Sequence, residues 1–197
     1  DPETERLIER VRSSGLRMAR MIDDLFDLSR ARSGVGIPIE RATVDALIIA
    51  QRAIAEQEQA AKDRSIVLTH AGSLEGNWDS DRIHQVLCNL LSNALRYGDP
   101  AAPITLTING EPSQITLAVH NGGSIPVQVL PHIFDPFRQH AADKRTRTGL
   151  GLGLYIVDQI LLAHGGKVAV ASTPDEGTTF TVRLPRYDSP ESRRPAG

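Results

Sequence analysis

The sequence has one cysteine and no long apolar segment, and each absence narrows the classes of protein open to it. Cys88 is the only cysteine among 197 residues, so no disulfide can form within the chain. Such cysteine usage is typical of proteins that fold in a reducing compartment. No apolar run approaches the roughly 20 residues that cross a bilayer. We therefore expect this segment to be cytoplasmic and to make no contact with a membrane. If the parent protein is membrane-anchored, this segment would be its cytoplasmic portion.

An excess of charge of one sign is also missing. The net charge is −2, with 23% charged and 40% hydrophobic residues. Proteins that bind nucleic acid through its phosphates commonly carry a basic excess, so we expect no nucleic-acid partner. The length and apolar content are sufficient for one good core, or for one domain with an appendage.

Residues 3–32 show the apolar spacing of a helix that packs along another helix. Positions that alternate by three and four are occupied by Ile8, Val11, Gly15, Met18, Ile22, Leu25 and Ser29. A helix of this length extends for about 45 Å, and its seam needs a partner helix. We expect half of a helical hairpin that dimerises into a four-helix bundle. A surface helix folded back on its own domain is the alternative.

The residues after this helix mark a domain boundary, because residues 33–38 contain two glycines and a proline. The prediction is a dimerisation helix over residues 1–34, a main domain over 35–186 and a disordered tail over 187–197. Within the main domain, helix caps are expected at Thr43 and at Asp79 or Ser80, and a hairpin turn at Asn109-Gly110. Helices are predicted at 44–64, 80–97 and 152–163, and strands at 37–41, 65–70, 104–108, 114–119, 167–171 and 179–184. This order predicts an α+β fold, a two-layer α/β sandwich.

Two segments carry the pattern of a binding site. Asn89 and Asn93 lie four residues apart in an apolar helical segment, hence on one helix face, where an unpartnered amide is costly to bury. The alternative is two surface amides bonded to the backbone. Gly149, Gly151 and Gly153 alternate just before a helix, where backbone N–H groups can approach a phosphate. The glycines are a weak signal alone, and they form neither a Walker A motif nor a Rossmann fingerprint.

The asparagine segment and the glycine segment resemble the N and G2 boxes of the histidine-kinase catalytic domain, a Bergerat-fold ATPase. Three other segments resemble its G1, F and G3 boxes, in that order: Asn121-Gly122-Gly123-Ser124-Ile125-Pro126, Phe134-Asp135-Pro136-Phe137 and Glu176-Gly177-Thr178-Thr179-Phe180. All five follow one another along the chain in the order of the family. The resemblance covers about residues 4–185. Its N-terminal part is similar to the second helix of the dimerisation and phosphotransfer domain.

The resemblance implies ATP and Mg²⁺ as cofactors and assigns roles to individual residues. Asn89, Asn93 and Arg96 match catalytic positions, and Asn93 matches the Mg²⁺ ligand. The positions implied to contact the nucleotide are Asn89, Asn93, Arg96, Tyr97, His120, Gly122, Ser124, Ile125, Phe137, Lys144, Arg147, Gly149, Leu150, Gly151, Leu152, Gly153, Leu154 and Thr178. Lys144 and Arg147 belong to a basic segment that resembles the family's ATP lid.

The identity of Asn89 bears on the reaction type. Bergerat ATPases that hydrolyse ATP have a glutamate base at this position, and an amide cannot act as a base near neutral pH. Asn89 therefore favours phosphoryl transfer over hydrolysis, and weighs against a hydrolysing ATPase. An anti-sigma-factor serine kinase is the other enzyme considered, and the N-terminal seam weighs against it.

The G1 box departs from the family pattern. His120 is matched to the position of an aspartate that accepts a hydrogen bond from adenine, and Ser124 replaces a glycine. A histidine accepts only when neutral, so this match predicts nucleotide affinity that falls below about pH 6.5. A degenerate, regulatory nucleotide-binding module is the alternative to a working kinase.

The resemblance implies a sensor histidine kinase that passes the γ-phosphate of ATP to a histidine and onward to a response-regulator aspartate. None of the six histidines is followed by an acidic residue and a proline, as the acceptor would be. The acceptor helix is therefore expected upstream of residue 1, and this chain alone is not expected to autophosphorylate. The implied partners are a second copy, through the N-terminal helix, and a response-regulator receiver domain.

Overall fold

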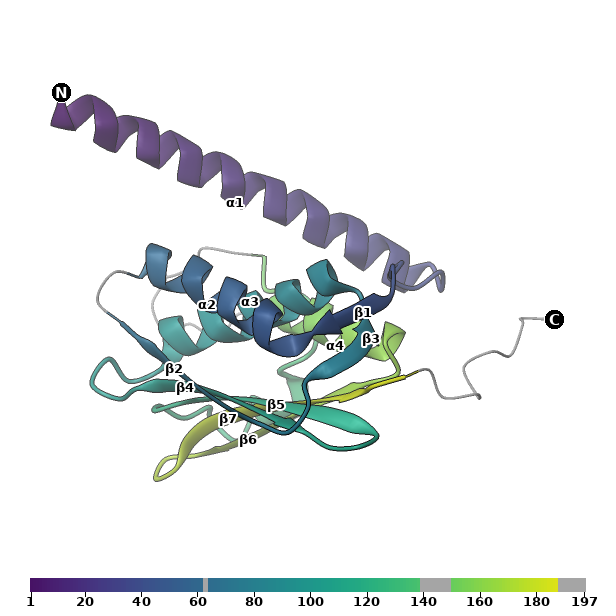
Figure 1. Ribbon diagram of the computed structural model, residues 1–197. Coiled ribbons are helices and arrows are strands. Elements are labelled where there is room, and N and C mark those ends of the chain that lie inside the picture. The colour runs from purple at the N-terminus through teal and green to yellow at the C-terminus, as the bar shows by residue number, and fades with distance from the viewer. Residues whose placement is uncertain (62–63, 139–149, 188–197) are drawn as a thin grey trace.

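The computed structural model describes residues 1–61, 64–138 and 150–187. A layer of helices covers one face of a β-sheet, and one long helix crosses above that layer (Figure 1). The elements in chain order are α1 (Pro2–Arg32), β1 (Ala42–Asp45), α2 (Ala46–Ala60), β2 (Ile66–Ala71), β3 (Glu75–Trp78), α3 (Ser80–Tyr97), β4 (Ile104–Gly110), β5 (Gln114–Asn121), η1 (Leu130–His132), α4 (Gly153–Ala163), β6 (Lys167–Thr173) and β7 (Gly177–Pro185). This arrangement confirms the predicted α+β class.

The main sheet has five strands in the order β2-β4-β5-β7-β6. β2 and β4 run parallel and the other neighbours antiparallel, so the sheet is mixed. β1 and β3 form a separate two-stranded sheet. Helices α2, α3 and α4 lie on one face of the main sheet, and no helix of the described residues covers its other face (Figure 1).

The core lies between the sheet and these helices. Alternate residues of β5, Ile115, Leu117 and Val119, are buried, as the two-residue period of a strand requires. They face an apolar stripe of α3 that includes Leu87 and Leu90, both fully buried. Burial of each such side chain contributes roughly 1.5–3 kcal/mol, so this contact fixes α3 on the sheet.

Helix α3 begins where the sequence predicts. Asp79 has an extended backbone, and its carboxylate accepts from the N–H groups of Asp81 and Arg82 at 3.1 and 3.0 Å. The N–H of Asp79 itself donates to Nε2 of the buried His164, 3.0 Å away. The start of α3 is therefore held by a side-chain cap and by the end of α4.

The structure corrects several local predictions. Residues 37–41 form no strand; the strand is β1, and its residue Thr43 pairs with Asn77 instead of capping a helix. Asp45 caps α2 by accepting from the N–H of Leu47 at 2.8 Å. The predicted turn residues 109–110 belong to β4, because the hairpin closes over residues 111–113. β3 was not predicted, since its four residues are too short to show a period.

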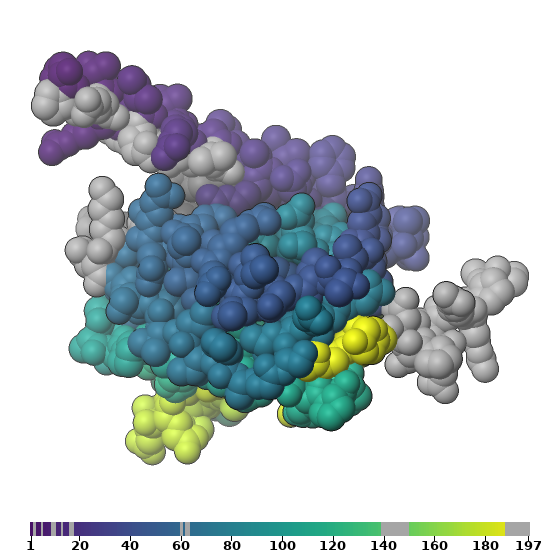
Figure 2. Space-filling view, viewed as in Figure 1, coloured from purple at the N-terminus to yellow at the C-terminus, as the bar shows by residue number. Residues whose placement is uncertain are grey.

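Helix α1 confirms the predicted N-terminal helix and contacts the main domain near its C-terminal end. Leu28 and Asp27 are buried there, and α1 also contacts α4. The Asp27 carboxylate accepts from both terminal nitrogens of Arg82, at 2.7 and 3.1 Å. The first turns of α1 project beyond the body of the molecule (Figure 2). Within the described residues, no helix combines the length and apolarity needed to cross a membrane.

Candidate functional site

A cavity of about 780 Å³ lies between α3, the segment that leads into α4, and the ends of β5 and β7. Many of the nucleotide-binding residues predicted from the sequence line it: Asn89, Asn93, Arg96, Tyr97, Ser124, Ile125, Leu150, Gly151, Leu152, Gly153, Leu154 and Thr178. Segments that are far apart in the sequence thus meet at one site. Lys144, Arg147 and Gly149 lie outside the described residues.

One wall of the cavity is a polar stripe on α3, formed by Asn89, Asn93 and Arg96. Their spacing of four and three residues places them on one helix face. The Nδ2 atom of Asn89 is buried and is the one side-chain polar atom, among the described residues, that is buried without a hydrogen-bond partner. An orphaned buried donor costs about 1–3 kcal/mol, so this amide is suited to a ligand that supplies an acceptor.

The opposite wall is the start of α4. Gly151 has φ +71°, and its carbonyl accepts from the N–H of Phe137 at 3.0 Å. A Cβ at Gly153 would approach Oδ1 of Asn89 to 3.3 Å, so the glycine lets the helix start come close to α3. No side chain caps α4 at Leu152. The open N–H groups of its first turn, with the helix dipole, make this wall suitable for an anion such as a phosphate.

The inner end of the cavity is built by β5, β7 and the loop after β5. Asn121 and Thr178 are only 4% and 3% exposed. The Thr178 hydroxyl donates to the carbonyl of Gly123 and also bonds the Ser172 hydroxyl, both at 2.8 Å. The N–H of Ile125 donates to Ser172 Oγ at 2.8 Å. These bonds hold the loop after β5 against β6 and β7 at this end of the cavity.

His120 does not line this cavity, although the family resemblance implied that it contacts the adenine. The buried positions of β5 are the odd-numbered ones, which continue from Val119 to Asn121. His120 therefore points to the open face of the sheet, where its Nδ1 lies 3.0 Å from the hydroxyl of Thr179 on β7. A shift of one residue reverses the face of a strand residue, and Asn121 takes the inward position. The alternation of β5 was the signal that could have identified Asn121.

Two other predicted residues also lie outside the lining. Gly122 is adjacent to the cavity but absent from its wall. Phe137 is 52% exposed and has an Arg32 guanidinium 6.0 Å from its ring centre. Tyr97, at the rim, carries Arg96 over its ring at 5.2 Å. The rim is thus more open than the inner end.

Residues of α1 also reach the cavity, which the sequence did not predict. Arg20, Met21 and Asp24 contribute to the lining near Asn89. Burial raises the pKa of Asp24 to about 6, helped by the neighbouring carboxylates of Asp27 and Asp23. These α1 residues reach the cavity because α1 packs on the main domain, and no local pattern in the sequence reveals that packing.

Comparison with known proteins extends these observations. The family model described as histidine kinase-, DNA gyrase B-, and HSP90-like ATPase matches residues 78–188. The chain is 33% identical over 187 residues to a bacteriophytochrome of Pseudomonas aeruginosa, a match that covers 94% of this chain and 26% of that protein. It is 34% identical over 191 residues to the probable sensor histidine kinase TcrY of Mycobacterium tuberculosis, covering 94% of this chain and 39% of TcrY.

A solved catalytic domain of the histidine kinase ThkA aligns with a TM-score of 0.65 and 25% identity, over 76% of this chain and 99% of that domain. The chain spans about a quarter to two fifths of the length of the two curated relatives. The matched family segment contains both asparagines of α3, the start of α4 and the ends of β5 and β7. The chain therefore belongs to the family of histidine kinase-, DNA gyrase B-, and HSP90-like ATPases.

Proposed function

We propose that this chain is the ATP-binding catalytic part of a sensor histidine kinase. It transfers the γ-phosphate of ATP to a histidine outside this chain, and from there to an aspartate of a response regulator. The observation that carries the proposal is the pairing of Asn89 and Asn93 on α3 with the uncapped start of α4 across one cavity. That arrangement offers amide groups and backbone N–H donors to a triphosphate.

The two ends of the cavity suggest how ATP lies in it. The inner end, where apolar Ile125 and Phe180 line the cavity with the polar Asn121 and Thr178, suits the adenine. Nδ2 of Asn121 donates to the carbonyl of Gly122 at 2.9 Å, which leaves Oδ1 as the acceptor for the exocyclic amine. The polar stripe of α3 and the start of α4 suit the phosphates. In this pose Asn121, and not His120, recognises the base.

The reassignment changes the expected pH dependence. A carboxamide does not titrate near neutral pH and accepts hydrogen bonds at every pH where the protein is folded. The predicted loss of affinity below about pH 6.5 depended on His120 at the adenine. With Asn121 in that place, recognition of the base is expected to be independent of pH.

The donor set of the cavity fits Mg²⁺. This ion prefers oxygen ligands and takes few from the protein when phosphates are present. Asn93, half-buried on the polar stripe, would hold it through its carboxamide oxygen. Bound there, Mg²⁺ would neutralise phosphate charge. Asn89, one turn away, positions the same phosphates through its buried Nδ2 donor.

The residues present favour transfer to a protein nucleophile over hydrolysis. Position 89 carries an amide, which cannot take a proton from water. The lining contains one carboxylate among the described residues, that of Asp24, and it comes from α1 and not from the catalytic domain. Catalysis would then consist mainly of positioning and of charge stabilisation.

We also propose that the chain forms a homodimer through α1 and divides into domains near residue 34. α1 ends at Arg32. Most apolar seam positions are exposed on the single chain, with Ile8 62%, Val11 72% and Met18 60% exposed. A second copy would cover them, as expected for a helical bundle. Because its phosphoryl donor is ATP, we place the chain in the cytoplasm.

Binding and hydrolysis measured on one preparation test the proposal. We expect Mg-ATP to bind in the micromolar range while steady-state hydrolysis stays at background. Rapid turnover by this chain would favour a hydrolysing ATPase. Absence of nucleotide binding would favour the regulatory module.

A further inference from the structure

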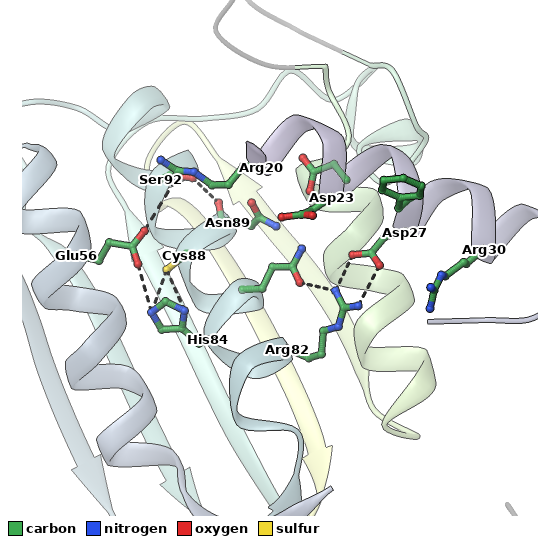
Figure 3. A pocket seen from close by; sticks show the side chains of 13 residues that line it. Arg20, Asp23, Asp27, Arg30, Glu56, Arg82, His84, Cys88, Asn89 and Ser92 are labelled. Atoms are coloured by element: carbon green, nitrogen blue, oxygen red, sulfur yellow. Dashed lines mark hydrogen bonds and ion pairs between the residues drawn. The ribbon is translucent and has the colours of Figure 1, made fainter. Parts of the chain in front are cut away.

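Three side chains outside the nucleotide cavity converge between α2 and α3. Glu56 extends from α2, and His84 and Cys88 lie one turn apart on the facing side of α3 (Figure 3). We propose that Glu56, His84 and Cys88 form a binding site for a borderline-soft divalent cation of the Zn²⁺ class. Thiolate, imidazole and carboxylate are the three protein ligand types that Zn²⁺ accepts.

The three ligand atoms all lie within 4.8 Å of one another, and the two separations that involve His84 match such an ion. Nε2 of His84 lies 3.5 Å from Sγ of Cys88 and 3.5 Å from Oε2 of Glu56. Zn²⁺ at its usual bond lengths holds tetrahedral ligand atoms about 3.3–3.6 Å apart. Sγ is also 3.9 Å from Nδ1, so a rotation of the imidazole about its Cβ–Cγ bond is needed to aim Nε2 at the ion.

The surroundings allow access and a fourth ligand. The three residues line a cavity of about 540 Å³ between α1, α2 and α3. Three protein ligands with a water in the fourth position are the arrangement of an open Zn²⁺ site. The other oxygen of Glu56, Oε1, faces Arg20 of α1 at 3.9 Å, so the carboxylate can serve the ion with one oxygen and the guanidinium with the other.

The protonation states of His84 and Cys88 determine how many protons the metal ion displaces when it binds. Burial lowers the pKa of His84, as does Arg52 of α2, while Glu56 and Asp81 act in the opposite direction. This direction favours the neutral imidazole, which is the form that binds a metal ion. Burial, with Glu56 next, raises the pKa of Cys88 to about 12 against the opposing effects of Gln57 and Arg20. Because the thiolate is the form that binds a metal ion, loading the site releases the thiol proton, about one per ion.

The site shares a helix with the nucleotide cavity. Cys88 is followed directly by Asn89, which lines both cavities. An ion held by residues of α2 and α3 would join the two helices on the side of α3 that adjoins the polar stripe. Neither the ligands nor the ion is needed for the nucleotide pose, so the two proposals can fail separately.

Cobalt(II) is a suitable probe because its thiolate complexes absorb in the near ultraviolet, and Cys88 is the only thiol in the chain. We expect a thiolate-to-cobalt band that saturates at about one ion per chain and disappears on addition of Zn²⁺. Cys88→Ala should abolish the band. His84→Gln and Glu56→Gln should each weaken binding at least about tenfold, whereas the exposed His70→Gln serves as the matched control and should leave it unchanged.

The structure of each variant is checked by circular dichroism, and proton release by calorimetry in buffers of different ionisation enthalpy. The proposal is overturned if the native chain gives no thiolate band. It is equally overturned if His84→Gln and Glu56→Gln, both folded, bind cobalt as tightly as the native chain, since Cys88 would then act alone. Release of about one proton per ion, lost in Cys88→Ala, supports it.

Discussion

Replacement of Asn121 should weaken ATP binding far more than replacement of its neighbour His120. Asn121 is 4% exposed at the inner end of the cavity, and its Nδ2 is already bonded to the carbonyl of Gly122 at 2.9 Å. In Asn121→Ala the exocyclic amine of a buried adenine loses its acceptor. An unsatisfied buried donor costs about 1–3 kcal/mol, which corresponds to a roughly 5- to 150-fold loss of affinity.

His120→Ala is the matched control, because the two residues are adjacent in β5 and point to opposite faces of the sheet. The contact of His120 is with Thr179 across the open face, so its removal should change the affinity less than about twofold. Isothermal titration with Mg-ATP and with Mg-ITP measures the effect of both variants. ITP lacks the exocyclic amine, so the native chain should discriminate against it and Asn121→Ala should not.

The opposite pattern would refute the assignment. If His120→Ala lost ATP binding while Asn121→Ala retained it with full discrimination, the histidine would be the residue that reads the base. The β5 register would then differ from the one observed here. Asn121→Asp, which supplies a carboxylate at the same place, should retain binding under our assignment.

Three further predictions concern α1 and the buried histidine. Asp27→Ala removes the carboxylate that accepts from Arg82 and should weaken the packing of α1 on the main domain by about 1.5–3 kcal/mol. Hydrogen exchange should then be faster at the amides of α1. Unchanged exchange would show that this ion pair does not hold the helix. Asp24→Asn should raise Mg-ATP affinity at pH 8, because this carboxylate lines the cavity and repels the phosphates. Because the pKa of Asp24 is about 6, the difference in affinity between the native chain and Asp24→Asn should decrease as the pH falls below 6. An equal gain in affinity at pH 8 and at pH 5.5 would contradict a charge effect. Burial lowers the pKa of His164, so below about pH 6.5 the unfolded chain binds more protons than the folded chain. The free energy of unfolding should therefore decrease as the pH falls in that range, by up to about 1.4 kcal/mol per pH unit. Denaturant unfolding of the native chain and His164→Gln should show that slope in the native chain and a smaller one in the variant.

The elements that were predicted well are those with a long period and a clear start signal. α3 combines an apolar stripe with the Asp79 cap, and α1 has an uninterrupted seam, so both could be located from the sequence. β1 and β3 are only four residues long, and they form because they pair with each other. A partner distant in sequence leaves no local pattern, which is why one was misplaced and the other missed.

The candidate site shows the same division. Asn89, Asn93 and Gly153 could be found because their spacing on a helix or before it has a direct physical meaning. The choice between His120 and Asn121 depended on a strand register of one residue, which the order of motifs does not fix. The burial of Ile115, Leu117 and Val119 fixes it once the face of the sheet is known. The contact of α1 with the cavity depends on tertiary packing: a helix folded back on its own domain was the stated alternative, but no local pattern could locate where it packs.

The most direct test of the central claim is a crystal structure of this chain with Mg²⁺ and a non-hydrolysable ATP analogue. We predict the triphosphate between α3 and the start of α4, with the ion about 2.1 Å from the carboxamide oxygen of Asn93. The exocyclic amine of adenine should lie within hydrogen-bond distance of Asn121. A nucleotide bound outside this cavity, or an ion with no contact to Asn93, would contradict the account.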